Sequence, residues 1–241
     1  MDITHETVPP PPTSLYRLAG VSKIYRKNGR DIPAVRDLDL EIRAGEWLAV
    51  QGKTGHGKST LLQLLGGLDR PTAGRLEFAG HDLATGAETK IRKVRATSFG
   101  FIFQSFNLVP TLTAAENVEA ALIPLGVPHH ERREKTAAAL DSVGLGDRAQ
   151  HLPGELSGGQ QQRVAIARAL VKSPDVLLAD EPSGNLDEDT RDEIIGLLDT
   201  LWRERGLTLI LVTHDSAIAR RAQRIGVMAR GRLSIRQDTR A

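Results

Sequence analysis

The stretch GKTGHGKS at residues 52–59 decides the fold of this 241-residue chain. It follows the apolar run WLAV at 47–50 and precedes TLLQLL at 60–65, so the pattern G-x-x-x-x-G-K-[ST] joins a predicted strand to a predicted helix. Glycines at these spacings let backbone N–H groups surround phosphate oxygens, and the start of a helix adds positive potential. The stretch therefore predicts a phosphate-binding loop, in preference to a plain glycine turn.

Two side chains of this loop have predicted chemical roles. Lys58 is expected to contact the β- and γ-phosphates of a nucleotide, and Ser59 is expected to ligate Mg²⁺. A phosphate loop alone fits kinases, GTPases and motor ATPases equally well. The candidate nucleotide-binding residues of this region are Gly52, Thr54, Gly55, Gly57, Lys58, Ser59 and Thr60.

The segments on both sides of the loop indicate an α/β fold. Short β-like runs, separated by Gly and polar turns, lie at residues 15–21, 34–42, 47–50 and 75–78. Helical periodicity follows in runs through 117–122, 132–143 and 160–171. Two continuous apolar runs at 176–179 and 207–212 are typical of buried parallel strands. A helix between them is expected to begin near Asp187 and to stop at Gly206, which gives the strand-helix-strand order of α/β proteins.

Composition limits the class of protein. Hydrophobic residues make up 40% and charged residues 26%, as in an ordinary globular domain, and the absence of cysteine excludes disulfides and thiolate metal sites. No segment approaches the ~18 apolar residues of a membrane span, so other chains are expected to cross any membrane involved. With a formal net charge of +2 and no basic block interleaved with aromatics, we expect no nucleic-acid partner. Residues 1–14, with prolines at 9–12, are predicted to form a flexible tail.

The stretch LSGGQ at 156–160, followed by QQRVAIARAL at 161–170, resembles the signature of ABC transporter ATP-binding subunits. A serine is a good helix cap, and glycines let a phosphate approach the N–H groups at a helix start. The stretch alone also fits an ordinary capped helix. Together with the phosphate loop, the resemblance implies a second anion site at Ser157, Gly158, Gly159 and Gln160, and a two-fold, head-to-tail pairing in which each signature completes the other chain's loop.

The strand VLLAD at 176–180, followed by Glu181, resembles the Walker B strand of the same family. The resemblance implies that Asp180 holds Mg²⁺ through water and that Glu181 acts as general base on the attacking water. A helix-capping role for the acid pair is the alternative, although Pro182 follows at once. His214, at the end of the next apolar run, stands where the family has its switch histidine, which reaches the γ-phosphate.

Three further positions receive roles from the resemblance. Gln104, which closes GFIFQ at 100–104, corresponds to a glutamine that contacts Mg²⁺ and water and links the nucleotide to the membrane subunit. Tyr25 corresponds to an aromatic residue that stacks on adenine, although a core tyrosine remains open. Asp187, in SGNLD at 183–187, is expected to contact the opposite subunit, while a helix-cap role alone remains open.

The matches run from residue 15 to about residue 232 in the family's order. They imply a P-loop NTPase core of ABC type with an antiparallel β subdomain and an inserted helical subdomain. Residues 15–241 are expected to form one domain, with 15–104 and 174–241 as core and about 105–173 as helical subdomain. The implied function is the binding and hydrolysis of ATP, with Mg²⁺, which powers membrane transport by closure of the dimer. The implied partners are integral membrane permease subunits, and the implied location is the cytoplasmic face of the cell membrane.

Within the family, residues 100–110, 112–118 and 184–187 resemble the lipoprotein-releasing and macrolide-exporter group (LolD and MacB type). An FtsE-like regulator of cell-wall enzymes, acting through a membrane partner without transport, is the alternative. Two positions depart from the family pattern, since His56 replaces a small residue in the loop and Ser183 replaces a threonine. His56 is expected to crowd the γ-phosphate or to touch the facing subunit.

Overall fold

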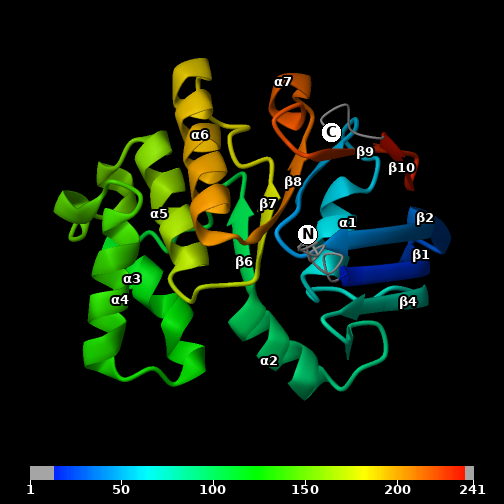
Figure 1. Ribbon diagram of the computed structural model, residues 1–241, viewed down its shortest axis with the longest axis horizontal. Coiled ribbons are helices and arrows are strands. Elements are labelled where there is room, and N and C mark those ends of the chain that lie inside the picture. The colour runs from blue at the N-terminus through cyan, green and yellow to red at the C-terminus, as the bar shows by residue number, and fades with distance from the viewer. Residues whose placement is uncertain (1–13, 237–241) are drawn as a thin grey trace, which may run out of the picture.

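A six-stranded sheet forms the centre of the computed structural model, which describes residues 14–236 (Figure 1). The strand order is β10-β9-β3-β8-β7-β6, and neighbours are parallel except for the antiparallel β9–β10 pair. The strands are β3 (Trp47–Gln51), β6 (Phe99–Phe103), β7 (Val176–Asp180), β8 (Thr208–Thr213), β9 (Arg224–Ala229) and β10 (Arg232–Arg236). The predicted buried strands are confirmed as β7 and β8. The tail predicted at residues 1–14 lies, except for Ser14, outside the described residues.

A second sheet is antiparallel throughout, with the order β2-β1-β4-β5. Its strands are β1 (Ser14–Lys27), β2 (Arg30–Arg43), β4 (Ala73–Phe78) and β5 (His81–Asp82). The first two strands are much longer than predicted, because the chain reverses only at Asn28 and Gly29, with φ values of 52° and 72°. Positive φ at both residues is typical of a two-residue hairpin turn, for which Asn-Gly is a favoured sequence.

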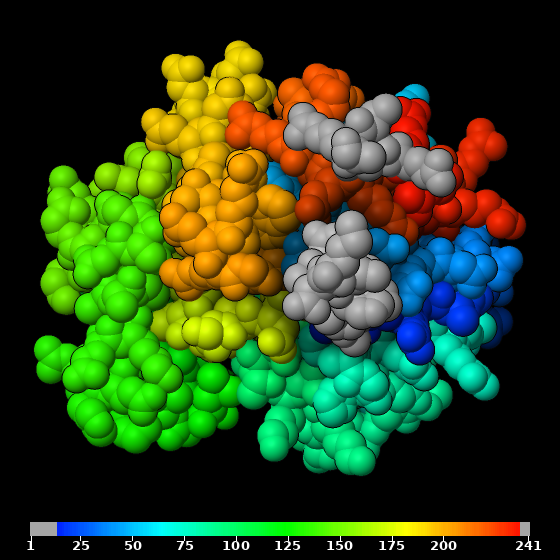
Figure 2. Space-filling model, viewed as in Figure 1, coloured from blue at the N-terminus to red at the C-terminus, as the bar shows by residue number. Residues whose placement is uncertain are grey.

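Helices cover both faces of the parallel sheet. The α-helices are α1 (Lys58–Leu65), α2 (Glu88–Ser98), α3 (Ala114–Glu119), α4 (His129–Asp141), α5 (Gly158–Leu170), α6 (Glu188–Arg205) and α7 (Ser216–Ala219), with short 3-10 turns η1 (Ala120–Leu125), η2 (Gly146–Arg148) and η3 (Pro153–Glu155). The run predicted as helix at 117–122 changes to a 3-10 turn at Ala120, and Pro124, inside that turn, has no N–H to continue an α-helix. Figure 2 shows the residues of α3 and α4, in green, as a lobe at the left, on the opposite side of α6 from the blue strands β1 and β2.

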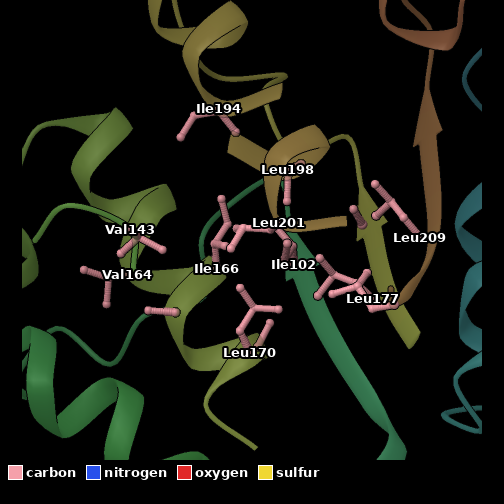
Figure 3. Packing of buried hydrophobic residues seen from close by; sticks show 14 of the residues in the cluster. Ile102, Val143, Val164, Ile166, Leu170, Leu177, Ile194, Leu198, Leu201 and Leu209 are labelled. Atoms are coloured by element: carbon pink, nitrogen blue, oxygen red, sulfur yellow. The ribbon is translucent and has the colours of Figure 1, made fainter. Parts of the chain in front are cut away.

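Alternate residues of the parallel strands enter two separate cores. Trp47 and Ala49 of β3 pack in the core that contains residues of α3 to α6, and Figure 3 shows strand residues Ile102, Leu177 and Leu209 in this core. Leu48 and Val50 of the same strand pack in the other core, with α1, α2 and the antiparallel sheet. Side chains alternate between the two faces of a strand, so the two cores lie on opposite faces of the sheet. Helices α1 and α5 are therefore separated by the sheet.

Candidate functional site

The loop at residues 52–57 joins β3 to α1 and passes very close to backbone atoms of other segments. A Cβ atom added to Gly52 would lie 2.3 Å from the Met228 carbonyl oxygen, and one added to Gly57 would lie 2.0 Å from the Ala34 carbonyl oxygen. Gly57 also has a φ of 98° and occupies the N-cap position of α1, where no side chain of residues 14–236 caps the helix. The N–H groups of the first turn are thus available to an anion.

Lys58 is the first residue of α1, and its side chain is only 6% exposed. Its ammonium group donates to the carbonyl oxygens of Gly52 at 2.8 Å and Lys53 at 3.3 Å, and it lies 3.6 Å from Oε1 of Glu181. A buried cation needs such partners. The structure therefore places the predicted phosphate-contacting charge at the centre of the loop.

Asp180 ends β7 and lies beside Ser59 of α1. The Ser59 side chain is close enough to interact with this carboxylate. Burial raises the pKa of Asp180, the nearby Glu181 carboxylate acts in the same direction, and Ser59 and Lys58 oppose them. A hydroxyl and a carboxylate fit Mg²⁺, which usually binds one or two protein groups together with water and substrate phosphates. Within residues 14–236, no group of three or more His, Asp or Glu side chains forms a ready-made metal cage.

Glu181 is held from several sides. Its φ of 46° is uncommon for a residue with a side chain, and its N–H donates to the Val212 carbonyl oxygen at 3.0 Å. The Nδ1 atom of His214 lies 2.9 Å from Oε2, while Lys58 lies near Oε1. The structure thus brings together Lys58, Glu181 and His214, although these residues come from three separate segments. His214 itself is largely exposed, with 63% of its side chain accessible.

Gln104 follows β6 and pairs with the loop at 183–187. Its Nε2 atom donates to Oδ1 of Asn185 at 3.0 Å, and Nδ2 of Asn185 donates to the Gln104 carbonyl oxygen at 3.1 Å. A Cβ atom on Gly184 would lie 2.8 Å from Nε2 of Gln104, so the glycine permits this close packing. The amide is engaged with this loop, and its predicted contact with magnesium stays a prediction.

The signature residues form the start of α5. The Ser157 hydroxyl accepts from the Gln160 N–H at 3.3 Å, and the Gln160 side chain accepts from the Ser157 N–H at 2.9 Å. This reciprocal pair is a capping box. Because α1 and α5 pack in cores on opposite faces of the sheet, the structure does not bring these residues together with the phosphate loop of the same chain.

Asp187 is the N-cap of α6, where its carboxylate accepts from the N–H and the hydroxyl of Thr190 at 3.0 and 2.9 Å. These hydrogen bonds lower the pKa of Asp187. The capping role is therefore observed, and the contact with a second subunit stays a prediction. The ring of His56 contacts β9, where its Nδ1 atom lies 3.3 Å from the carbonyl oxygen of Met228. Its predicted contact with the γ-phosphate or with a facing subunit stays a prediction.

Two contacts of the site were not predicted. Gln162 of α5 is fully buried, and its Nε2 atom donates to the carbonyl oxygen of Pro182, next to Glu181. The only available signal is its place four residues before the buried Ile166, on the apolar side of the helix. Tyr25, partly buried on β1, donates its hydroxyl hydrogen to Asp69 at 2.8 Å. The sequence gives no signal that links residues so far apart.

A phosphate loop opening a helix, with an acid pair at the end of a neighbouring parallel strand, defines a P-loop nucleotide-binding protein. A family model described as ABC transporter matches residues 35–184, and the chain belongs to that family. Dimeric structures of the ATP-binding cassette MJ0796, one of them bound to ADP and Pi, align with a TM-score of 0.87 at 39% identity, over 94% of this chain and 100% of theirs. The predicted family and its fold, with an antiparallel β subdomain and a helical subdomain, are confirmed.

Curated relatives support the predicted subgroup. The macrolide export ATP-binding/permease protein MacB 1/2 of Paracoccus denitrificans is 46% identical over 219 residues, which are 91% of this chain and 33% of the relative. The uncharacterized ABC transporter ATP-binding protein YvrO of Bacillus subtilis is 44% identical over 216 residues, which are 90% of this chain and 94% of the relative. The chain thus spans about one third of the length of the MacB relatives. Among the described residues, no helix is long and apolar enough to cross a membrane.

Proposed function

We propose that this chain is the ATP-hydrolysing subunit of a membrane transport complex of the macrolide-export type, working as a head-to-tail dimer that closes around ATP. The observation that carries the proposal is the contact of Glu181 with both Lys58 and His214, beside a helix start that no described side chain caps. Phosphoryl transfer to water needs a positive cradle for the phosphates and a fixed group that orients the water. These residues supply both.

Each residue of this group would have a distinct task. The N–H groups of the first turn of α1 and the Lys58 ammonium would stabilise charge on the phosphates. Glu181 would accept the proton of the attacking water, and His214 would hold its carboxylate in place. Magnesium, which Ser59, Asp180 and Gln104 would hold, would neutralise charge on the β- and γ-phosphates when bound. Tyr25 would contact the adenine base.

The separation of the two helix starts supports the dimer. Helices α1 and α5 pack on opposite faces of one sheet, so a nucleotide held at α1 would need the start of α5 from a second copy. The structures of the similar cassette MJ0796 are dimeric, one of them bound to ADP and Pi, which supports a dimer for this chain. ATP would then favour the closed dimer, and a preference of about 5 kcal/mol is enough to move such an equilibrium almost completely.

A permease would be the partner that receives this motion. The MacB relatives are named ATP-binding/permease proteins, and this chain spans about one third of their length. The permease function would belong to the integral membrane part of the complex, with this chain at the cytoplasmic face of the membrane.

Phosphate release from Mg-ATP by the purified chain, with Glu181→Gln as the matched inactive variant, tests the enzymatic part. Equal release by the two proteins would remove Glu181 as general base. Affinity capture from detergent-solubilised membranes tests the partner. A captured permease supports transport, a captured membrane regulator of cell-wall enzymes supports the FtsE-like alternative, and capture of no membrane chain contradicts both.

A further inference from the structure

Tyr25 is fixed by its hydroxyl group, at a point outside the phosphate loop. The hydroxyl donates to Oδ2 of Asp69 at 2.8 Å, and the Thr60 side chain of α1 makes a second contact with it. Burial and the hydrogen bond to Asp69 raise the pKa of Tyr25, so the phenol keeps its proton and remains a donor. The ring is therefore tied by one edge to the α1 region.

The Asp69 carboxylate accepts hydrogen bonds from two further groups besides the Tyr25 hydroxyl. Its Oδ1 atom accepts from the Lys23 ammonium at 2.6 Å and from the Arg70 N–H at 2.7 Å. Although burial acts in the opposite direction, the hydrogen bonds from Lys23 and Tyr25 keep the pKa of Asp69 below its usual value. Asp69 thus stays a carboxylate that accepts from three donors at once.

The segment that carries Asp69 is anchored to the helix of the phosphate loop. The N–H groups of Leu68 and Asp69 both donate to the Gln63 carbonyl oxygen of α1, at 2.9 and 3.3 Å. Movement of α1 would therefore carry Asp69 with it. Through Asp69, the position of the Tyr25 ring depends on the same helix that begins at the phosphate loop.

Lys23 determines which side of the ring is available. Its ammonium lies over the Tyr25 ring, 5.0 Å from the centroid, and also donates to the Arg70 carbonyl oxygen at 2.7 Å. A cation at this distance over an aromatic face is attracted to it. Since Lys23 takes one face, a planar base would stack on the opposite face.

We propose that Asp69 is a positioning residue for recognition of the nucleotide base. By accepting from Tyr25 and Lys23 together, it sets the tilt of the ring and its distance from the phosphate loop. This inference rests on the proposed ATP binding and extends it from the phosphates to the base. A role in folding alone would affect every ligand of the loop equally, whereas a positioning role affects only ligands that carry a base.

Competition against a fluorescent ATP analogue measures the affinities of ATP and of inorganic tripolyphosphate, which has no base. We expect Asp69→Ala to weaken ATP binding about three- to tenfold and to change tripolyphosphate binding less than about twofold. Tyr25→Phe keeps the ring but loses the anchoring hydroxyl, so it should act in the same direction, and the double variant should show no additional loss. Asp31→Ala is the matched control, because Asp31 pairs only loosely with Arg26, at 4.0 Å, on the same hairpin.

Unchanged ATP affinity in Asp69→Ala would overturn the proposal, as would an equal loss for the two ligands. If Asp69→Ala does not fold, Tyr25→Phe and Asp69→Asn test the proposal instead, by the ratio of the loss in ATP affinity to the loss in tripolyphosphate affinity. Asn keeps one acceptor oxygen and should give a smaller loss in the same direction, and a normal ratio in both variants would again overturn the proposal. A wild-type chain that binds neither ligand would instead contradict the proposed function itself.

Discussion

The starts of α1 and α5 are both predicted to meet phosphate groups, yet their local structures differ. At α1, Gly57 occupies the N-cap position and no described side chain bonds to the first turn. At α5, Ser157 and Gln160 already satisfy each other's N–H groups in a capping box. The first helix start is therefore ready for an anion in the single chain, because its donors lack side-chain partners.

This difference indicates an order of events. The open start at α1, with the buried Lys58, would bind the nucleotide first. The capped start at α5 is stable without a ligand and has fewer free donors, so it would contribute mainly when a second chain brings a nucleotide to it. The start of α1 with Lys58 would then provide the affinity for the nucleotide. The signature residues at the start of α5 would contact a nucleotide that is already bound to the other chain.

The largest expected effect is at the open helix start. Lys58→Ala removes the buried ammonium and should weaken ATP binding about 100-fold, since hydrogen bonds between charged groups are the strong ones. Isothermal calorimetry measures this loss. Lys93→Ala, on the exposed side of α2, is the control and should bind ATP normally. Unchanged ATP binding by Lys58→Ala would contradict the assignment of residues 52–59 as a phosphate-binding loop.

A smaller effect is expected at the capped helix start. A Cβ on Gly158 would lie 3.2 Å from Cδ2 of Leu186, a flexible side-chain end, and alanine is a better helix former than glycine. Gly158→Ala should therefore fold and bind ATP as the wild type does, but its steady-state hydrolysis should fall about tenfold, because the added methyl obstructs a phosphate at the N–H groups. Gly154→Ala is the control, as no described atom lies within 4 Å. Full turnover by Gly158→Ala would show that the signature meets no phosphate.

The capping box itself predicts a stability effect. Ser157→Ala removes the acceptor for the Gln160 N–H and should lower the free energy of unfolding by about 1 kcal/mol in urea denaturation. The helix start at α1 has no comparable cap to lose. Stability equal to wild type would indicate that the box does not form in solution, and the contrast between the two helix starts would disappear.

The smallest effect lies at the other end of α5. Burial, followed by the Arg95 charge, lowers the pKa of Lys172 from 10.5 to about 8. Between these values the unfolded chain binds more protons than the folded chain, so the contribution of Lys172 to stability increases as pH rises from about 8 to about 10.5. The unfolding free energy of the wild type minus that of Lys172→Met should rise between pH 7 and pH 10, by about 1 kcal/mol or less because the group is partly exposed. A difference that is constant with pH would contradict the shift.

Local patterns predicted much of the fold. The phosphate loop, strands β7 and β8, and the bounds of α6 follow from glycines, continuous apolar runs and the caps Asp187 and Gly206. Helix α2 was not predicted, because only Ile91 and Val94 are buried on it and its apolar stripe is too sparse. The Asn28-Gly29 turn was also missed, although this dipeptide is a strong hairpin signal.

The arrangement of the site needed the structure. The pairs Tyr25–Asp69 and Gln104–Asn185 join residues distant in sequence, and no spacing rule predicts them. Helices α1 and α5 pack on opposite faces of the parallel sheet. Helical periodicity does not specify which face of a sheet a helix covers, so this arrangement was not predicted. The division at residues 105 and 173 remains a prediction.

The central claim is that ATP joins two chains, each through the other's signature. Light scattering of Glu181→Gln, with and without ATP, tests it most directly, since a base-deficient variant should bind ATP and hydrolyse it only slowly. We predict the mass of one chain without ATP, twice that mass with ATP, and one chain again when Gly158→Asp is added to the variant. A variant that binds ATP and keeps the mass of a single chain would contradict the account.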